Sequence, residues 1–190
     1  MIALSGALEN AVADPAEVIS TYILAKDGNR PWLMHRAFAE GARLEMVVNT
    51  DAISFPPTAA GTGAITDAFV RRFSGDHENV YTLCLSSPPE AFTKQFSCDW
   101  LVGMSRRDNV EIRVGCGRYD WSFADENGML ASDLKITIAV MRVFAPEHLR
   151  PIMSWLSELP YPWCPARAAA QSIPDLDGLR SISDFLRQRI

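Results

Sequence analysis

Lysine is scarce in this chain of 190 residues, and basic residues do not cluster. Lys26, Lys94 and Lys135 are the only lysines among 18 basic residues, and the net charge is −5. Nucleic-acid-binding proteins neutralise phosphates with a clustered basic face. The scattered arginines therefore argue against a nucleic-acid partner.

Long apolar runs are absent as well. The sequence contains no stretch of 18 apolar residues of the kind that predicts a membrane-spanning helix. The N-terminal segment lacks a basic region and carries Glu9 within its apolar part, which is untypical of a signal peptide. We therefore expect no membrane partner and a cytoplasmic location.

Spacings typical of metal and cofactor sites are missing. The four cysteines form no CxxC pair and have no histidines at zinc-ligand spacing, so we expect reduced, mostly buried thiols. The glycine-rich GTGAIT lacks the preceding βαβ context of a dinucleotide fingerprint, and no P-loop is present. Nothing in the sequence requires a metal or a cofactor.

What is present is a core-forming composition with helices in the first half. Apolar residues make up 48% of the chain and charged residues 22%, which is typical of a folded globular protein. Asp14-Pro15 favours a helix start, and that helix ends near 27–29. Two further helices are predicted at PWLMHRAF and GTGAITDAFVRRF.

The pattern then changes to strands. Alternating, β-branched and aromatic segments predict strands at ARLEMVV, NVYTLCL, KQFSCDWLVGMSR, VEIRVGCGRYDWSF and LKITIAVMRVF. A turn is expected over 125–128 and a β-bulge at Gly115-Cys116-Gly117. LRPIMSWL contains Pro151, which would break a helix interior, so a final edge strand is predicted there.

Helices followed by antiparallel strands indicate an α+β fold. A curved sheet wrapped around about three helices leaves a central hollow, which is the natural ligand site. We expect a single domain over 1–160 and a C-terminal tail over 161–190. The tail carries a short amphipathic helix, about 175–188, whose apolar face must be covered by the chain's own domain or by a partner subunit.

Several segments resemble the NTF2-like, or SnoaL-like, superfamily, which includes ketosteroid isomerases, scytalone dehydratase, polyketide cyclases and ligand-binding modules. The matching segments are VISTYILAKDGN, FAEGARLEM and a Gly-x-x-x-Ile at 61–65, in that order. The resemblance covers about 14–159. It implies a cystatin-like cone of strongly curved, mostly antiparallel sheet, usually a homodimer formed through the sheet, with a small hydrophobic ligand in the pocket.

The catalytic residues of ketosteroid isomerases carry over only in part. The resemblance places Tyr22 at the tyrosine that donates a hydrogen bond to the substrate oxygen. It places Met46 at the general base, and Ala139 or Val140 at the second acid. Since methionine cannot accept a proton, ketosteroid-type isomerisation is not expected, and Met46 is interpreted as an apolar pocket wall.

Chemistry of the scytalone dehydratase type relies on histidines on the strands, and no histidine of this chain lies on a predicted strand. The three histidines are His35 in the second predicted helix, His77 in the GDHEN loop and His148 near Pro146. His35 can still point inward from its helix as a substrate-binding residue, although a core or surface histidine is the more ordinary interpretation.

Polar residues within the predicted strands supply the remaining candidates. Asp99 and Asp120 can act as a general acid or base if they enter the cone, where burial would raise the carboxyl pKa. Arg118 can hold a substrate carboxylate, or it can neutralise Asp120. In the alternative, both acids lie on the convex face in arginine pairs. Trp100 and Trp121 either stack on a ligand or simply pack.

Two hypotheses follow for the function. In the first, the protein is a cofactor-independent isomerase, lyase or hydrolase of a hydrophobic carbonyl- or hydroxyl-bearing substrate, with Tyr22 as donor and Asp99 or Asp120 as proton shuttle. In the second, it is a noncatalytic dimeric ligand-binding module. A partner subunit of a larger enzyme, similar to the β subunits of the superfamily's dioxygenases, is a third, more distant alternative.

Overall fold

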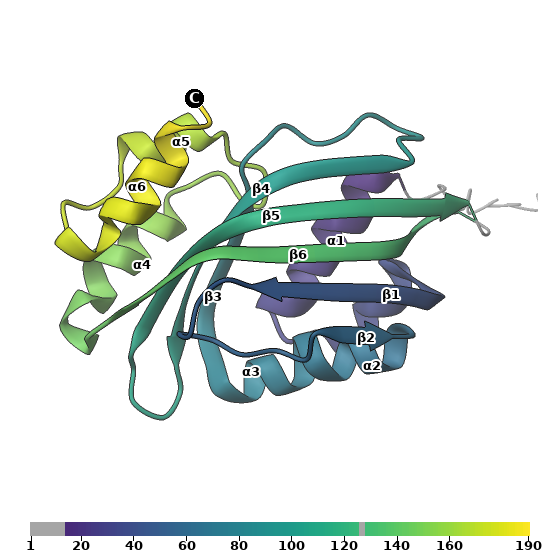
Figure 1. Ribbon diagram of the computed structural model, residues 1–190, viewed down its shortest axis with the longest axis horizontal. Coiled ribbons are helices and arrows are strands. Elements are labelled where there is room, and N and C mark those ends of the chain that lie inside the picture. The colour runs from purple at the N-terminus through teal and green to yellow at the C-terminus, as the bar shows by residue number, and fades with distance from the viewer. Residues whose placement is uncertain (1–13, 126–127) are drawn as a thin grey trace, which may run out of the picture.

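A six-stranded sheet forms the centre of the protein, whose computed structural model describes residues 14–125 and 128–190 (Figure 1). The strand order is β2-β1-β6-β5-β4-β3. Neighbouring strands pair antiparallel except β1 and β6, which are parallel. The strands are β1 (Phe38–Val48), β2 (Thr58–Ala60), β3 (His77–Cys84), β4 (Gln95–Arg106), β5 (Ile112–Asp125) and β6 (Met129–Phe144).

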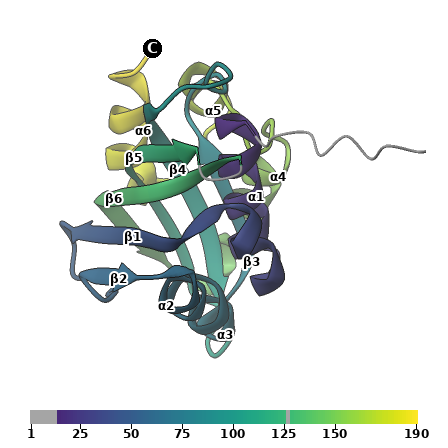
Figure 2. The same cartoon turned by 90° about the vertical axis from the view of Figure 1, so that its right-hand side faces the viewer.

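The helices of the first half lie inside the curve of this sheet (Figure 2). They are α1 (Pro15–Asp27), the 3-10 helix η1 (Pro31–Arg36) and a continuous helical run of α2 (Thr62–Thr66), the π-helical η2 (Asp67–Arg72) and α3 (Phe73–Asp76). The predicted start of α1 is confirmed, because the Asp14 carboxylate accepts a hydrogen bond from the Glu17 amide at 2.7 Å.

Alternation along the strands divides the sheet into two apolar faces. The concave face packs on α1 and the α2–α3 run through residues such as Trp100, Tyr119 and Ile136. The convex face carries Leu101, Val114 and other side chains that belong to a second core. The expected α+β architecture with a curved, mostly antiparallel sheet is confirmed.

Helices at the C-terminal end cover part of the convex face, at the left of Figure 1. They are η3 (Pro146–His148), α4 (Leu149–Ser157), α5 (Ala166–Gln171), η4 (Asp177–Leu179) and α6 (Arg180–Arg187). Leu179, Ile182 and Leu186 are at most 1% exposed. The apolar face of the predicted tail helix is therefore covered by the chain's own sheet. The domain boundary at residue 160 stays a prediction.

The edge strand predicted at LRPIMSWL is wrong, because this segment is helix α4. Helix α4 begins directly after the 3-10 turn η3, and Pro151 is its third residue. Amide groups in the first turn of a helix have no partner within the helix, so proline removes no hydrogen bond there. Ile152, Trp155 and Leu156 are then free to pack on the sheet.

The bulge expected at Gly115-Cys116-Gly117 lies across the ladder from that segment. Cys116 pairs with Val140 and Gly117 pairs with Ile138, so the extra residue is Ala139 on β6. The pairing of β5 with β6 continues to Asp125 and Met129, as a hairpin requires. The turn expected over 125–128 includes residues outside the described part of the chain.

Two further observations limit the kinds of site that the fold offers. None of the described helices combines the length and apolar character needed to cross a membrane. In the described part of the chain, no three histidine, cysteine or carboxylate side chains are grouped as metal ligands. All four cysteines are buried, as the sequence predicts.

Candidate functional site

A small cavity lies between α1, the α2–α3 run and the concave face of the sheet. Its volume is about 50 Å³, which is room for a few water molecules. Most of the wall is aromatic or aliphatic, and the polar contributions come from two tyrosines, a lysine and a threonine. The lining residues are Tyr22, Lys26, Met46, Ile53, Phe55, Phe69, Phe73, Thr82, Trp100, Val102, Met104, Tyr119, Ile136, Ile138 and Met141.

Tyr22 lies in the cavity wall, on the inward face of α1. Its ring packs edge-on against Phe38, Tyr119 and Trp121, with centroid distances of 5.6, 6.3 and 5.5 Å. Burial raises the pKa of Tyr22 above its usual value, and the nearby Asp27 carboxylate adds to the rise. The phenol is therefore neutral at pH 7 and can donate a hydrogen bond.

Three further candidates lie on the same concave side. Met46 on β1 and Trp100 on β4 both form part of the wall. Trp121 on β5 supports the Tyr22 ring and is 2% exposed. The indole nitrogens of Trp100 and Trp121 are buried without a hydrogen-bond partner among the described residues. The cavity thus contains a thioether where the resemblance expects a base.

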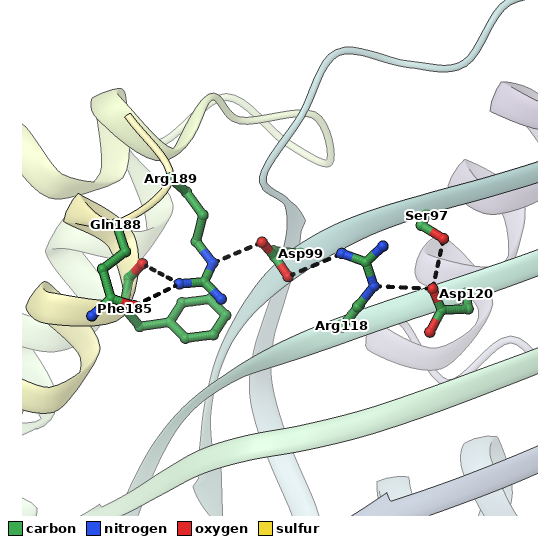
Figure 3. Close-up of polar contacts among 7 residues, drawn as sticks. All are labelled: Ser97, Asp99, Arg118, Asp120, Phe185, Gln188 and Arg189. Atoms are coloured by element: carbon green, nitrogen blue, oxygen red, sulfur yellow. Dashed lines mark hydrogen bonds and ion pairs between the residues drawn. The ribbon is translucent and has the colours of Figure 1, made fainter.

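Asp99 and Asp120 point away from this cavity, to the convex face of the sheet (Figure 3). Asp99 accepts a hydrogen bond from Arg189 at 2.7 Å, and its other oxygen lies 4.0 Å from Arg118. Asp120 accepts hydrogen bonds from Arg118 at 3.0 Å and from Ser97 at 2.6 Å.

The structure therefore does not bring Tyr22 together with either acid. The alternation of β4 and β5 places each acid on the face opposite the buried aromatic residues beside it. A proton shuttle between Tyr22 and Asp99 or Asp120 would have to cross the sheet. Arg118 neutralises the two acids instead of facing the cavity, which agrees with the convex-face alternative.

His35 is also separated from the cavity. It lies on η1, is exposed, and packs against Trp32 with ring centroids 4.2 Å apart and the ring planes tilted by 51°. Its Nδ1 atom contacts the Trp32 carbonyl oxygen. The helix predicted at this point is only a short 3-10 turn, so the register that would have turned His35 inward is not formed.

A buried polar cluster at one end of the cavity was not predicted. Lys26 donates to the Asp27 carboxylate and to the Thr82 hydroxyl, both at 2.7 Å. Asp27 also accepts from the Thr82 amide at 2.7 Å and from the Tyr161 hydroxyl at 3.1 Å. The Lys26 and Asp27 side chains are 8% and 5% exposed.

The positions of these residues along the chain explain why the cluster could not be predicted from the sequence. Thr82 and Tyr161 lie 55 and 134 residues from Asp27 along the chain. The VISTYILAKDGN segment contains Lys26 and Asp27 side by side at a helix end, where a charged pair usually faces solvent. Only the tertiary packing of β3 and the 161–164 segment turns it into a buried network.

The chemical capacity of the cavity follows from these groups. Its described lining contains hydrogen-bond donors, but no carboxylate and no imidazole. Both oxygens of the adjacent Asp27 are already engaged by hydrogen bonds. The site can hold and orient an oxygen atom within an apolar enclosure, and it lacks a free proton acceptor.

No protein-family model and no curated protein matches the chain. Solved structures do match, among them an NTF2-like superfamily protein from Salmonella enterica serovar Typhimurium, with a TM-score of 0.52 and 16% identity. That match covers 66% of this chain and 88% of the other. The chain has the NTF2-like fold.

Two other structures with this architecture differ in what they do. A computationally designed 17-OHP binder matches with a TM-score of 0.53 and 11% identity, over 70% of this chain and all of that one. A hexachlorocyclohexane dehydrochlorinase, LinA type 2, matches with a TM-score of 0.50 and 11% identity, over 67% and 84%. At these identities the matches establish the NTF2-like fold alone.

Proposed function

We propose that this protein binds a small, largely apolar molecule that carries a carbonyl or hydroxyl oxygen. The observation that supports the proposal is the composition of the cavity wall, in which Tyr22 and Tyr119 are embedded among aromatic and methionine side chains. Apolar enclosures with a few polar groups are typical of ligand pockets. The Tyr22 hydroxyl is the proposed donor to the ligand oxygen.

Binding requires the wall to rearrange, because the cavity is only about 50 Å³. Met46, Met104 and Met141 all contribute to the wall. Methionine is unbranched and adapts its shape at low cost, so these thioethers are the side chains that we expect to move. In this proposal Met46 gives the pocket plasticity at the position where the resemblance expects a base.

A noncatalytic role fits the geometry best, because Asp99 and Asp120 are on the convex face. An isomerase, lyase or hydrolase is the second candidate, and one observation favours it. The Lys26 ammonium group borders the cavity and is held by Asp27 and Thr82. An ammonium group in that position can polarise a substrate oxygen as a proton donor. Binder and dehydrochlorinase neighbours are compatible with either role.

The test uses 2-decanone as the ligand and decane as the matched hydrocarbon without an oxygen. Trp100 lies in the wall, so binding is measured by tryptophan fluorescence. Tyr22→Phe removes the hydroxyl and keeps the ring. Since one hydrogen bond contributes about 0.5–1.5 kcal/mol, this variant should weaken 2-decanone binding by about two- to tenfold and leave decane unchanged.

The control variant is Tyr81→Phe, since Tyr81 packs against the convex core and does not line the cavity. Equal losses in the two variants, or no binding of either probe, would contradict the proposal. Mass spectrometry of the recovered 2-decanone distinguishes the two candidates. An unmodified ligand supports the binding module, and a product supports the enzyme.

We also propose that the protein forms a homodimer through its sheet, as the resemblance implies. The support is the polar surface over β1, β2, the start of β4, the end of β5 and the start of β6, which no residue of the C-terminal helices lines. Light scattering coupled to size-exclusion chromatography measures the mass directly. A mass of about 21 kDa at all concentrations would count against the dimer.

A further inference from the structure

A second depression, of about 410 Å³, opens on the concave side next to the cavity. The two share the side chains of Ile53, Phe55 and Phe73, which lie between them. Phe55 stacks on the Phe73 ring with centroids 6.4 Å apart. The depression and the cavity are therefore neighbours, and these three side chains form the wall that the two share.

The sheet supplies the basic floor of this depression. Met104 lines the cavity and is paired with Arg113 across β4 and β5, so Arg113 also points to the concave side. His77 is paired with Arg106 at the start of β3. Arg113, His77 and Arg106 therefore lie on the concave face just beyond Met104, where its apolar part ends.

Arg113 is a half-buried cation whose Nε atom is buried without a hydrogen-bond partner. None of the ion pairs within the described part of the chain includes it, whereas Arg106 is bound to Asp108. Burial lowers the pKa of Arg113, and the neighbouring Arg106 lowers it further. The carboxylates of Glu111, Asp108 and Asp76 oppose this shift from a distance. A partly buried guanidinium group without a direct ion pair is costly unless an anion completes it.

His77 supplies a second unpartnered group in the same depression. It is only 6% exposed. Its Nδ1 lies 3.1 Å from the Phe73 carbonyl oxygen, which can only accept, so Nδ1 carries a proton. Its Nε2 is buried and has no partner among the described residues. Two orphaned nitrogen atoms, on His77 and Arg113, thus border one depression.

Acidic side chains at the rim do not satisfy these groups. Asp51 and Asp76 line the depression and are exposed, and the exposed Arg72 lines it as well. Neither carboxylate forms an ion pair with Arg113 in the described structure. The exposed rim therefore carries one net negative charge, while the floor formed by His77, Arg106 and Arg113 is basic and incomplete.

We propose that this depression binds the carboxylate of an amphiphilic ligand whose apolar part enters the cavity between Phe55 and Phe73. Arg113 is the principal partner of the carboxylate, because a guanidinium group matches two carboxylate oxygens. His77 donates through Nε2 when its ring is protonated. The inference rests on the proposed function, since it assigns the class of ligand that the same cavity takes.

The proposal implies that binding takes up a proton at His77. Burial lowers the pKa of His77, and the neighbouring Arg113 and Arg106 lower it further. Asp76 and the hydrogen bond to the Phe73 carbonyl oppose this shift. A bound carboxylate favours the imidazolium form, so it raises this pKa. A fatty carboxylate stays ionised down to about pH 5. Its affinity should therefore rise as the pH falls from 8 to 6.

The experiment compares decanoate with 1-decanol, which has the same chain without a charge, and with acetate, which has the charge without the chain. Decanoate should bind at least tenfold more tightly than 1-decanol and a hundredfold more tightly than acetate. Arg113→Met should remove the preference for decanoate and change 1-decanol binding by less than twofold. The matched control is Arg142→Met, an exposed arginine on the convex face of β6.

His77→Asn keeps a donor for the Phe73 carbonyl and removes Nε2, so it should abolish the pH dependence. The pH series on the unaltered protein still tests the proposal if Arg113→Met does not fold. Equal affinity for decanoate and 1-decanol, or equal losses in both arginine variants, would overturn this inference and leave the proposed function intact. If neither 1-decanol nor 2-decanone binds, both this inference and the proposed function are contradicted.

Discussion

Arg189 Nε lies 2.7 Å from Asp99 Oδ2, although the two residues are 90 positions apart in the chain. The same guanidinium group stacks over the Phe185 ring, 3.5 Å from its centroid (Figure 3). The contact fastens the end of α6 to β4. Asp99, a candidate for catalysis from the sequence, is thus a structural anchor on the convex face.

Replacing Asp99 with Asn should loosen α6 without affecting ligand binding. The pair is partly exposed, at 30% and 17% for the two side chains, so a loss of about 1 kcal/mol in the free energy of unfolding is expected. Asp177→Asn, in a pair exposed by 81% and 92%, is the control with no measurable change. Urea unfolding measures both. Loss of 2-decanone binding with unchanged stability would contradict the structural role.

Removing the Lys26 cation should be far more damaging. Lys26→Met leaves the Asp27 carboxylate buried without its charged partner, which typically costs about 3–5 kcal/mol. The double variant Lys26→Met with Asp27→Asn should recover part of that loss. Lys135→Met breaks the exposed pair with Glu45 and should cost about 0–1 kcal/mol. Thermal and urea unfolding are the measurements, and equal costs for the two single variants would refute the buried network.

Gly117 should not tolerate a side chain. A Cβ atom there would lie 1.8 Å from the Thr137 carbonyl oxygen and 2.7 Å from the Trp100 ring. Since the first contact is with backbone, the strand pair must shift, and Gly117→Ala should destabilise by about 1–3 kcal/mol. Gly63→Ala has open space around it and lies in a helix, so a neutral or stabilising effect is expected.

Stability should fall at alkaline pH. Burial raises the pKa of Cys116 from 9.0 to about 12. It also raises the pKa of Tyr22 and Tyr119 above the usual 10.0. The unfolded chain ionises these groups first, so their stabilising contribution is complete below pH 9 and is lost as the pH rises toward 12. The melting temperature measured from pH 8 to 11 should decrease steadily. A flat profile would show that these groups are not buried in solution.

Local signals in the sequence predicted much of the fold. Asp14-Pro15 marked the start of α1, and alternation separated Asp99 from Trp100 and Asp120 from Trp121 on opposite faces. Alternation cannot tell which face is concave, because a period of two is symmetric. The assignment of the acids therefore stayed open until the sheet could be seen with its two cores.

The site depended on contacts that no local pattern contains. Lys26 meets Thr82 only through packing, at a separation of 56 residues. His77, expected in a loop, is the first residue of β3, where a shared hydrogen-bond ladder places it beside Arg106. The α4 segment was misjudged because a proline in the first turn of a helix has the same sequence signature as one that ends a strand.

The C-terminal helices also determine how the sheet can be used by another molecule. They occupy the convex face over β3, the later part of β4, the start of β5 and the end of β6, which leaves β1, β2 and the other halves of β4, β5 and β6 open. That open surface carries the ion pairs Arg43–Asp133 and Lys135–Glu45. A subunit that docks on this surface meets alternating positive and negative side chains instead of an apolar patch. Because salt screens such charges, an assembly formed here would dissociate at high salt concentration.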